Sequence, residues 1–348
     1  MRHAPLLSWP VTYLQPGVRV GRYEVAELIR LESIGPLYQV HDAARAARLS
    51  LLLLPAVECD IDASSRFDRA VRSLIRLRHP NLAAVVDSGE FEGTPYLVIE
   101  HFPDGTLAGL IADGKRLGEG PSLRLLRGVA NGIDGAHREG AIHGDLRPEW
   151  IFTDAAGNAV VAGVGLARFF ASPTGTTMAS QYVPPERVMG VDIGAAADVY
   201  ALTALVYELL AGRPPFDEEQ PEALLYAQVH GEPRPASQAN PDLPEEMDGV
   251  LLRGLAKDPR DRWPTCVDLV DAVESALRAA RPVPQDLADG PVIGAGARSP
   301  RLSEAPRTGP NRLVIACGLF ALALALLVAI VILERSPLTS WPELGRPA

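Results

Sequence analysis

The amino-acid sequence predicts an α+β fold of two lobes, followed by a single transmembrane helix. Short strand-like runs dominate residues 22–100, whereas apolar residues at helical spacing dominate residues 101–281. Residues 313–333 then form a run of 21 residues without a charge. A small sheet lobe beside a larger helical lobe places the expected ligand site in the cleft between the lobes.

The first lobe is expected to contain five strands and one helix, after an N-terminal extension at residues 1–21. The helix, at residues 64–78, carries Phe67, Val71, Leu74 and Ile75 on one apolar face. The strands are expected at residues 22–29, 37–42, 48–54, 83–91 and 94–102. The second lobe is expected to be helical at residues 122–140, 195–212, 222–231 and 265–280.

The C-terminal part carries the signals of a membrane anchor. Residues 282–311 are rich in Pro, Gly, Ala and Arg and are expected to be a juxtamembrane linker. The uncharged run would span about 30 Å as a helix, the thickness of a bilayer core, so residues 312–334 are the expected transmembrane helix. Arginines are more numerous before this helix than after it, which places the two-lobe domain in the cytoplasm. We therefore expect a single-pass protein of the cell membrane with a short extracytoplasmic tail at residues 335–348.

Charge and cysteine content argue against two kinds of site. The net charge is −10 and no basic run is present, so a nucleic-acid partner is not expected. The three cysteines, Cys59, Cys266 and Cys317, are far apart in the sequence and belong to no Cys/His cluster. We therefore expect neither a metal site nor a disulfide framework.

Six segments follow one another in an order that is typical of one enzyme family. They are RLRHPNL (76–82), GTPYLVIEHFPDGTLAGLI (93–111), IHGDLRPEWIF (142–152), YVPPERV (182–188), ADVYALTALVYELLAGRPPF (197–216) and DPRDRWPT (258–265). Together they resemble the eukaryotic-type Ser/Thr protein kinase domain of bacterial membrane-anchored kinases. The resemblance covers residues 22–281 and implies a protein kinase fold, with an N-lobe at residues 22–100 and a C-lobe at residues 101–281.

The resemblance also implies structural roles for three residues. Asp198 would anchor the backbone of the catalytic loop from the central helix of the C-lobe. Glu186 and Arg262 would form a buried pair of carboxylate and guanidinium. These residues hold the fold together and perform no chemistry, so their presence does not predict activity.

Phosphoryl transfer in this family uses a glycine-rich loop over the phosphates, a strand lysine held by a helix glutamate, two metal-binding residues and a catalytic aspartate. Of the three expected glycines only Gly35 is present, and Arg30 and Glu32 occupy the other two positions. Arg30 is the plausible cationic substitute near the phosphates, although a solvated loop arginine is the favoured interpretation. Glu32 would add negative charge beside a triphosphate.

The strand lysine and the helix glutamate are both missing. Leu52 stands at the lysine position, and its neighbours are leucine too. The chain has lysine only at Lys115 and Lys257, so the N-lobe has none that could be relocated. Ala70 stands at the position of the helix glutamate. The two losses agree with each other, because a glutamate there would have no lysine to hold.

The catalytic loop keeps Asp145 at the position of the catalytic base, while Gly144 replaces an arginine. Trp150 replaces the metal-binding asparagine, and its indole offers an N–H donor but no acceptor for Mg²⁺. Gly163 opens the triplet that normally begins with the metal-binding aspartate. Because Mg²⁺ requires oxygen ligands, no metal is expected here. Asp145 is interpreted as a structural hydrogen-bond acceptor, and a residual base is the alternative.

The hinge between the lobes is expected at Glu100 to Phe102, with Ile99 as the gatekeeper beside it. In the family the hinge binds adenine through backbone groups, which substitutions do not remove. These residues and Gly35 make up the expected nucleotide pocket. Binding of ATP without a metal therefore stays open, although no cofactor is expected.

The sequence thus predicts a membrane-anchored pseudokinase that acts as a scaffold or regulator for protein partners, such as an active kinase. Two alternatives stay open. One is an active Ser/Thr protein kinase with unorthodox handling of ATP, whose activity would depend on Asp145. The other is a metal-independent nucleotide sensor.

Overall fold

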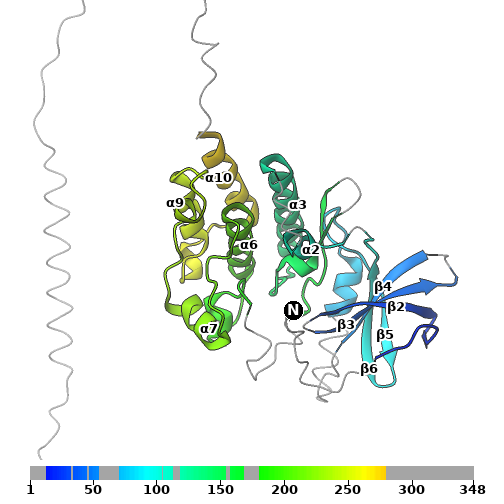
Figure 1. Ribbon diagram of the computed structural model, residues 1–348. Coiled ribbons are helices and arrows are strands. Elements are labelled where there is room, and N and C mark those ends of the chain that lie inside the picture. The colour runs from blue at the N-terminus through cyan, green and yellow to red at the C-terminus, as the bar shows by residue number, and fades with distance from the viewer. Residues whose placement is uncertain are drawn as a thin grey trace, which may run out of the picture. The chain divides into compact units, whose positions relative to one another are not determined.

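The computed structural model describes residues 13–32, 34–44, 47–54, 70–103, 105–112, 118–153, 157–167 and 180–279. Figure 1 shows a twisted sheet formed by the N-terminal part of the chain and a group of helices formed by the later part. The expected linker, transmembrane helix and tail lie outside the described residues. Within the described residues, no helix is long and apolar enough to cross a membrane.

The N-lobe contains an antiparallel sheet with the strand order β1-β2-β3-β4-β6-β5. The strands are β1 (Arg19–Val20), β2 (Tyr23–Glu32), β3 (Gly35–Asp42), β4 (Ala47–Leu53), β5 (Val85–Phe91) and β6 (Thr94–Glu100). Five of them match the strands predicted from the sequence. Residues 70–76 are helical, inside the range predicted for the helix of this lobe.

The first strand, β1, corrects the predicted start of the N-lobe. Residues 1–21 were expected to be an extension, but Arg19 and Val20 pair with β2. Val20 is fully buried, and Gly21 makes the turn between the strands with a φ of +59°. A strand of two residues is too short for an alternating pattern, so its sequence carries no strand signal.

The two faces of the sheet contribute to different apolar clusters. Leu51 and Leu53 of β4 pack with Tyr23 and Tyr38 on one face. Leu52, between them, belongs to the main core, which continues into the C-lobe. Because successive side chains of a strand point to opposite faces, this assignment fixes Leu52 on the face toward the cleft.

The C-lobe is built around one helix that is buried on all sides. This helix, α6 (Ala195–Ala211), is buried at every residue from 197 to 207. The longer helices around it are α3 (Glu119–Arg138), α7 (Pro221–His230), α9 (Glu246–Gly254) and α10 (Cys266–Ala279). The shorter elements are α2 (Leu107–Ala112), η1 (Pro148–Trp150), the strand pair β7 (Ile151–Thr153) and β8 (Ala159–Val161), α5 (Pro185–Val188), α8 (Ala236–Ala239) and η2 (Pro259–Asp261). All four helical segments predicted for this lobe are confirmed as α3, α6, α7 and α10.

Two local interactions explain how the surrounding helices are held. The carboxylate of Asp134 on α3 accepts hydrogen bonds from the backbone N–H groups of Cys266 (3.0 Å) and Val267 (2.9 Å), which begin α10. Free N–H groups at a helix start need such acceptors, so Asp134 joins the two helices.

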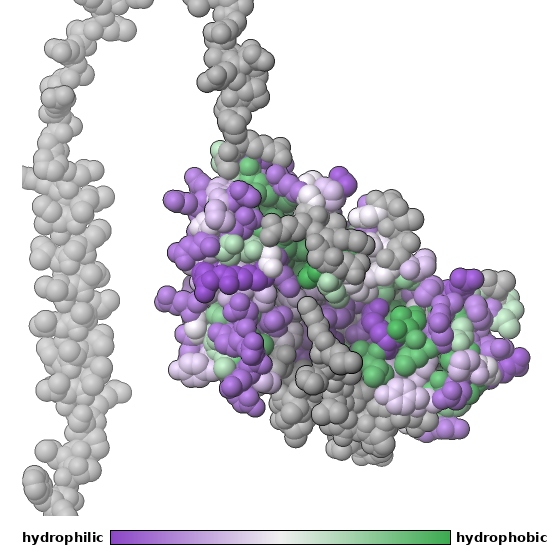
Figure 2. Space-filling model, in the orientation of Figure 1, coloured by the Kyte–Doolittle hydropathy of each residue, from purple (hydrophilic) through white to green (hydrophobic). Residues whose placement is uncertain are grey.

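On the surface shown in Figure 2, hydrophilic residues predominate on the helical lobe, and a group of hydrophobic residues is visible on the sheet lobe.

A matched pair of glycines on α9 tests the packing of α9 against α6. A Cβ added at Gly254 would collide with the buried side chain of Thr203, whereas one added at Gly249 would meet no atom within 4 Å. We expect Gly254→Ala to destabilise the fold by about 1–3 kcal/mol through overpacking. Gly249→Ala should instead stabilise it by up to about 1 kcal/mol, because alanine favours the helix. Urea unfolding of both variants measures the difference, and equal effects would contradict the packing described.

Candidate functional site

The catalytic loop is anchored by Asp198 of α6, which is 1% exposed. One carboxylate oxygen accepts hydrogen bonds from the backbone N–H of His143 (2.9 Å) and from the Nε2 atom of His137 (2.7 Å). The other accepts from the backbone N–H of Gly144 (2.8 Å). Burial lowers the pKa of His143, which favours the neutral ring, and Nε2 of the ring bonds to the carbonyl of Ala162 at 2.9 Å. The loop frame that the resemblance implied is thus present.

Both carboxylate oxygens of Asp145 face arginines. Oδ1 lies 3.0 Å from Nη1 of Arg187, and Oδ2 lies 3.3 Å from Nε of Arg147. Arg187 also donates to the carbonyl of Gly144. The catalytic loop, which has glycine at position 144, thus receives an arginine from α5, Arg187. Sequence reasoning missed Arg187, because no local pattern relates it to a loop 42 positions earlier.

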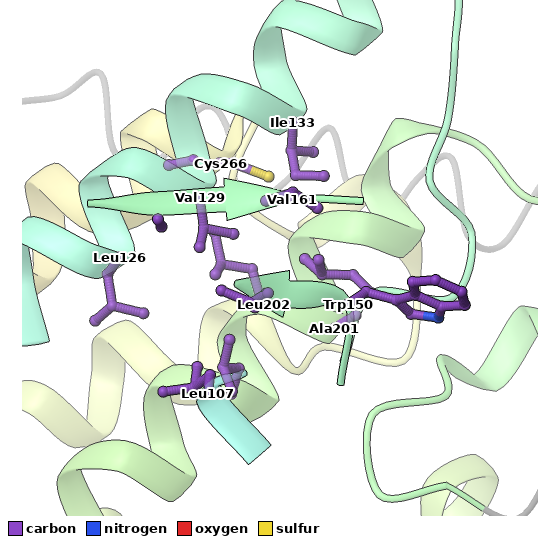
Figure 3. Close-up of a cluster of buried hydrophobic side chains, with 14 of the residues drawn as sticks. Leu107, Leu126, Val129, Ile133, Trp150, Val161, Ala201, Leu202 and Cys266 are labelled. Atoms are coloured by element: carbon purple, nitrogen blue, oxygen red, sulfur yellow. The ribbon is translucent and has the colours of Figure 1, made fainter. Parts of the chain in front are cut away.

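The ring of Trp150 lies against the backbone of Gly163. Trp150 is 2% exposed, and Figure 3 shows its indole extending away from the aliphatic side chains Leu107, Leu126, Val129 and Leu202. A Cβ at Gly163 would be 2.8 Å from Cδ2 of the ring and 3.0 Å from Cε3. Gly163 also has a φ of +81°, which side chains rarely adopt. The tryptophan at position 150 and the glycine at position 163 fit each other, because the ring occupies the space that a carboxylate at position 163 would enter.

An apolar cavity lies beside this ring. Leu52, Ile99, Trp150 and Gly163 line it, together with Leu74, Leu77, Leu82, Ala83, Val85, Leu97, Val161, Val164 and Leu166. About 30 Å³ is available to the centres of water molecules, enough for one or two. A stable buried water needs two to four polar partners, and the indole N–H of Trp150 is the one polar side-chain group among these lining residues. The structure thus brings three of the predicted degenerate positions, Leu52, Trp150 and Gly163, together with the predicted gatekeeper Ile99, whereas Ala70 is not among the lining residues.

The glycine that is retained, Gly35, is required by its contact with β4. Its φ is +145°, and an added Cβ would collide with the carbonyl oxygen of Leu53. Arg30 is not the solvated loop arginine favoured from the sequence. Its Nη2 donates to the carbonyl of Glu149 at 2.9 Å, and its guanidinium lies 5.1 Å from the centre of the Phe152 ring. Both contacts cross from the N-lobe to the catalytic loop.

Glu32 is also placed differently from expectation. It is 2% exposed, is bonded to Arg30 and lies 3.7 Å from Nη2 of Arg147. Burial raises the pKa of Glu32, and the two arginines oppose this rise. Its carboxylate therefore does not project toward an open phosphate site. The charge is already engaged inside the protein.

The hinge follows β6 and adjoins the same cleft. Glu100 is exposed, and its carboxylate accepts a hydrogen bond from the backbone N–H of Ala84 at 3.1 Å. The ring of Phe102 lies 5.1 Å from that of Phe152, at an interplanar angle of 34°. Ile99 is 6% exposed and lines the apolar cavity. Of the predicted pocket residues, Phe102 therefore lies next to the ring on which Arg30 lies, whereas Ile99 lines the cavity and Gly35 lies against β4.

Glu186 and Arg262 form the buried pair that the resemblance implied. The two guanidinium Nη atoms each donate to one oxygen of Glu186 at 2.7 Å. Arg262 also donates to the carbonyls of Ala196, Ala256 and Lys257. Such a two-point arrangement is among the stronger charge-assisted contacts in proteins.

Magnesium and ATP are the ligands that this fold implies, and the residues present do not fit the metal. Trp150 and Gly163 offer no side-chain oxygen where two metal ligands are expected, and Leu52 offers no cation. Among the described residues, no group of three His, Cys, Asp or Glu side chains could hold a metal ion.

Comparison with known proteins identifies relatives over the same part of the chain. The protein kinase domain family matches residues 56–273, a range that begins after the glycine-loop and lysine positions. A probable serine/threonine-protein kinase of Streptomyces coelicolor is 30% identical over 289 residues, which are 79% of this chain and 43% of the relative. Serine/threonine-protein kinase PknE of Mycobacterium tuberculosis is 30% identical over 270 residues, which are 76% of this chain and 48% of the relative. The chain thus spans less than half the length of these relatives.

Solved structures agree with this assignment. The crystal structure of the Mycobacterium tuberculosis PknI kinase domain matches with a TM-score of 0.61 and 29% sequence identity, covering 76% of this chain and 100% of that chain. The two-lobe protein kinase fold predicted from the sequence is therefore confirmed. Taken with the loop frame around Asp198 and the match to residues 56–273, the chain belongs to the protein kinase domain family and is related to the eukaryotic-type Ser/Thr kinases of bacteria.

Proposed function

We propose that this domain is a catalytically inactive member of the family, which acts as a scaffold or regulator through its surface. The observation that carries the proposal is the packing of the Trp150 ring on Gly163. One ring accounts for the loss of both metal ligands, since it replaces the first and fills the space of the second. Removing a single preorganised electrostatic group from an active site typically lowers the rate by about 10²–10³.

Two further features support the proposal. Leu52 places an isobutyl group in an apolar cavity where a cation would be needed for the phosphates. Asp145 is paired with Arg147 and Arg187, so both of its carboxylate oxygens already face arginines of the chain itself. A general base has to lie within hydrogen-bond reach of the substrate hydroxyl, so this engagement of both oxygens suits a structural role.

The alternative is an active Ser/Thr protein kinase. It is favoured by the relatives, because those described above are named serine/threonine-protein kinases. It also agrees with the retention of Asp145 at the position of the catalytic base. A third function, metal-independent nucleotide sensing, would use the hinge backbone beside Phe102.

The proposal includes the place where the protein acts. The uncharged run at residues 313–333 supports a single-pass anchor in the cell membrane, with the kinase-like domain in the cytoplasm. Membership in this family supports protein partners in a phosphorylation pathway, and an active kinase is the partner we propose. Detergent-solubilised full-length chain is therefore the material for the following test.

Thermal unfolding with saturating ATP, with and without Mg²⁺ or Mn²⁺, tests the proposed function. A ligand at about one hundred times its dissociation constant stabilises a fold by about 2.7 kcal/mol. We expect no metal-dependent rise in the unfolding temperature and no transfer of labelled phosphate to protein. A metal-dependent rise, with transfer that disappears in Asp145→Asn, would establish the active kinase instead. A rise with ATP alone would favour the nucleotide sensor.

A further inference from the structure

Two side chains of β2 cross the cleft and contact the catalytic loop. Arg30 donates to the carbonyl of Glu149 at 2.9 Å and lies over the Phe152 ring. Glu32 is bonded to Arg30, and its other oxygen lies 3.7 Å from Nη2 of Arg147. The N-lobe and the C-lobe are thus joined by groups that belong to the chain itself.

The burial of Glu32 shows that this contact depends on closed lobes. Its side chain is 1% exposed, and those of Arg30 and Arg147 are 25% and 15% exposed. A carboxylate without water is unfavourable unless cations or donors surround it. Here one cation comes from its own strand and the other from the opposite lobe. If the lobes separated, Glu32 would lose Arg147 and regain water.

The contact extends to the hinge on one side and to Asp145 on the other. Phe152, under the guanidinium of Arg30, stacks against Phe102 of the hinge. Arg147 also forms an ion pair with Asp145, and Asp145 in turn pairs with Arg187. The cluster therefore holds the guanidinium groups of Arg30, Arg147 and Arg187 and the carboxylates of Glu32, Asp145 and Glu149. If Glu32 is displaced, the guanidinium groups outnumber the remaining carboxylates, which suits a ligand that carries phosphate groups.

We propose that Glu32 is an internal anion that occupies a site formed by Arg30 and Arg147 and so latches the two lobes together. A phosphate-bearing ligand enters this site only by displacing the Glu32 carboxylate, and its entry opens the latch. The site uses arginines alone and requires no metal. The inference does not rest on the proposed function, because the latch closes the cleft whether or not the domain transfers phosphate.

The variant Glu32→Gln removes the internal charge while keeping the shape of the side chain. Glu27→Gln is the matched control, because Glu27 is exposed on the same strand and its replacement changes the net charge equally. The probe is inorganic tripolyphosphate without metal, titrated calorimetrically into the folded full-length chain. We expect Glu32→Gln to bind the probe at least about tenfold more tightly than the wild type, a difference of 1.4 kcal/mol. Glu27→Gln should bind it as the wild type does.

Hydrogen exchange provides a second readout that needs no ligand. In Glu32→Gln, the amides of residues 28–37 and 147–152 should exchange about tenfold faster than in the wild type, because the lobes separate more often. Replacing Arg147 by Gln in the Glu32→Gln chain should abolish the gain in tripolyphosphate binding. Equal binding by Glu32→Gln and Glu27→Gln would overturn the anion site. Unchanged exchange in Glu32→Gln would overturn the latch.

Discussion

Replacing Glu186 by alanine is expected to lower the free energy of unfolding by about 3–5 kcal/mol, because it leaves the charge of Arg262 buried without its carboxylate. Arg262 is 3% exposed and cannot turn toward water. Its remaining partners are backbone carbonyls, which do not neutralise the charge. Urea unfolding followed by fluorescence measures the effect, and the unfolding temperature should fall by about 10 °C.

The control for this experiment is an exposed ion pair in the same lobe. Arg260 is paired with Asp258 at 2.6 Å, but its side chain is 88% exposed. Arg260→Ala should therefore leave the free energy of unfolding close to that of the wild type. If Glu186→Ala lowered the free energy of unfolding as little as this control does, the buried pair would not hold α5 against the rest of the C-lobe.

The second large effect concerns the fit between Trp150 and Gly163. We expect Gly163→Asp, which restores the missing metal-binding carboxylate, to destabilise the fold by about 2–4 kcal/mol. The new Cβ would be 2.8 Å from the indole ring, and the φ of +81° strains any side chain. Trp150→Asn should cost about 3–5 kcal/mol, because it leaves a cavity where the indole was buried.

The double variant tests whether the two single substitutions destabilise the fold through one shared contact or independently of each other. Removing the ring makes space for the aspartate, so Gly163→Asp with Trp150→Asn should lose at least about 1 kcal/mol less than the sum of the single variants. Denaturant unfolding of the wild type and the three variants completes the cycle. Strict additivity would mean that the ring does not exclude a side chain at position 163. We expect no kinase activity from the double variant, since Leu52 remains in place.

Local patterns in the sequence were sufficient for most of the fold. Short strand-like runs predicted β2, β3, β4, β5 and β6, and helical spacing predicted α3, α6, α7 and α10. Even the position of Leu52 toward the cleft follows from β4, because both its neighbours lie on the other face. β1 was missed, since its two residues are too few to show a period.

The candidate site was predictable only in its composition. The resemblance located Trp150 and Gly163, but not that one ring fills both places. Arg30 and Glu149 are 119 positions apart, and nothing in the sequence links them. The signal available in the sequence was a pair of opposite charges, Arg30 and Glu32, two positions apart in the expected glycine-rich loop. It was interpreted as a solvated arginine and a repelling acid, because burial is set by the opposite lobe and not by the loop itself.

The apolar character of Leu52 has a consequence for how this protein is detected in cells. A reagent that tags kinases by acylating an amine at the nucleotide site needs a lysine there. In this chain no lysine precedes position 115, and Lys257 donates its ammonium to backbone carbonyls at the end of α7, in the C-lobe. Such a reagent finds no amine at Leu52 even if a nucleotide enters the cleft. An inventory built on such a reagent would therefore not register this protein through an amine at position 52, and its level has to be followed by counting its peptides directly.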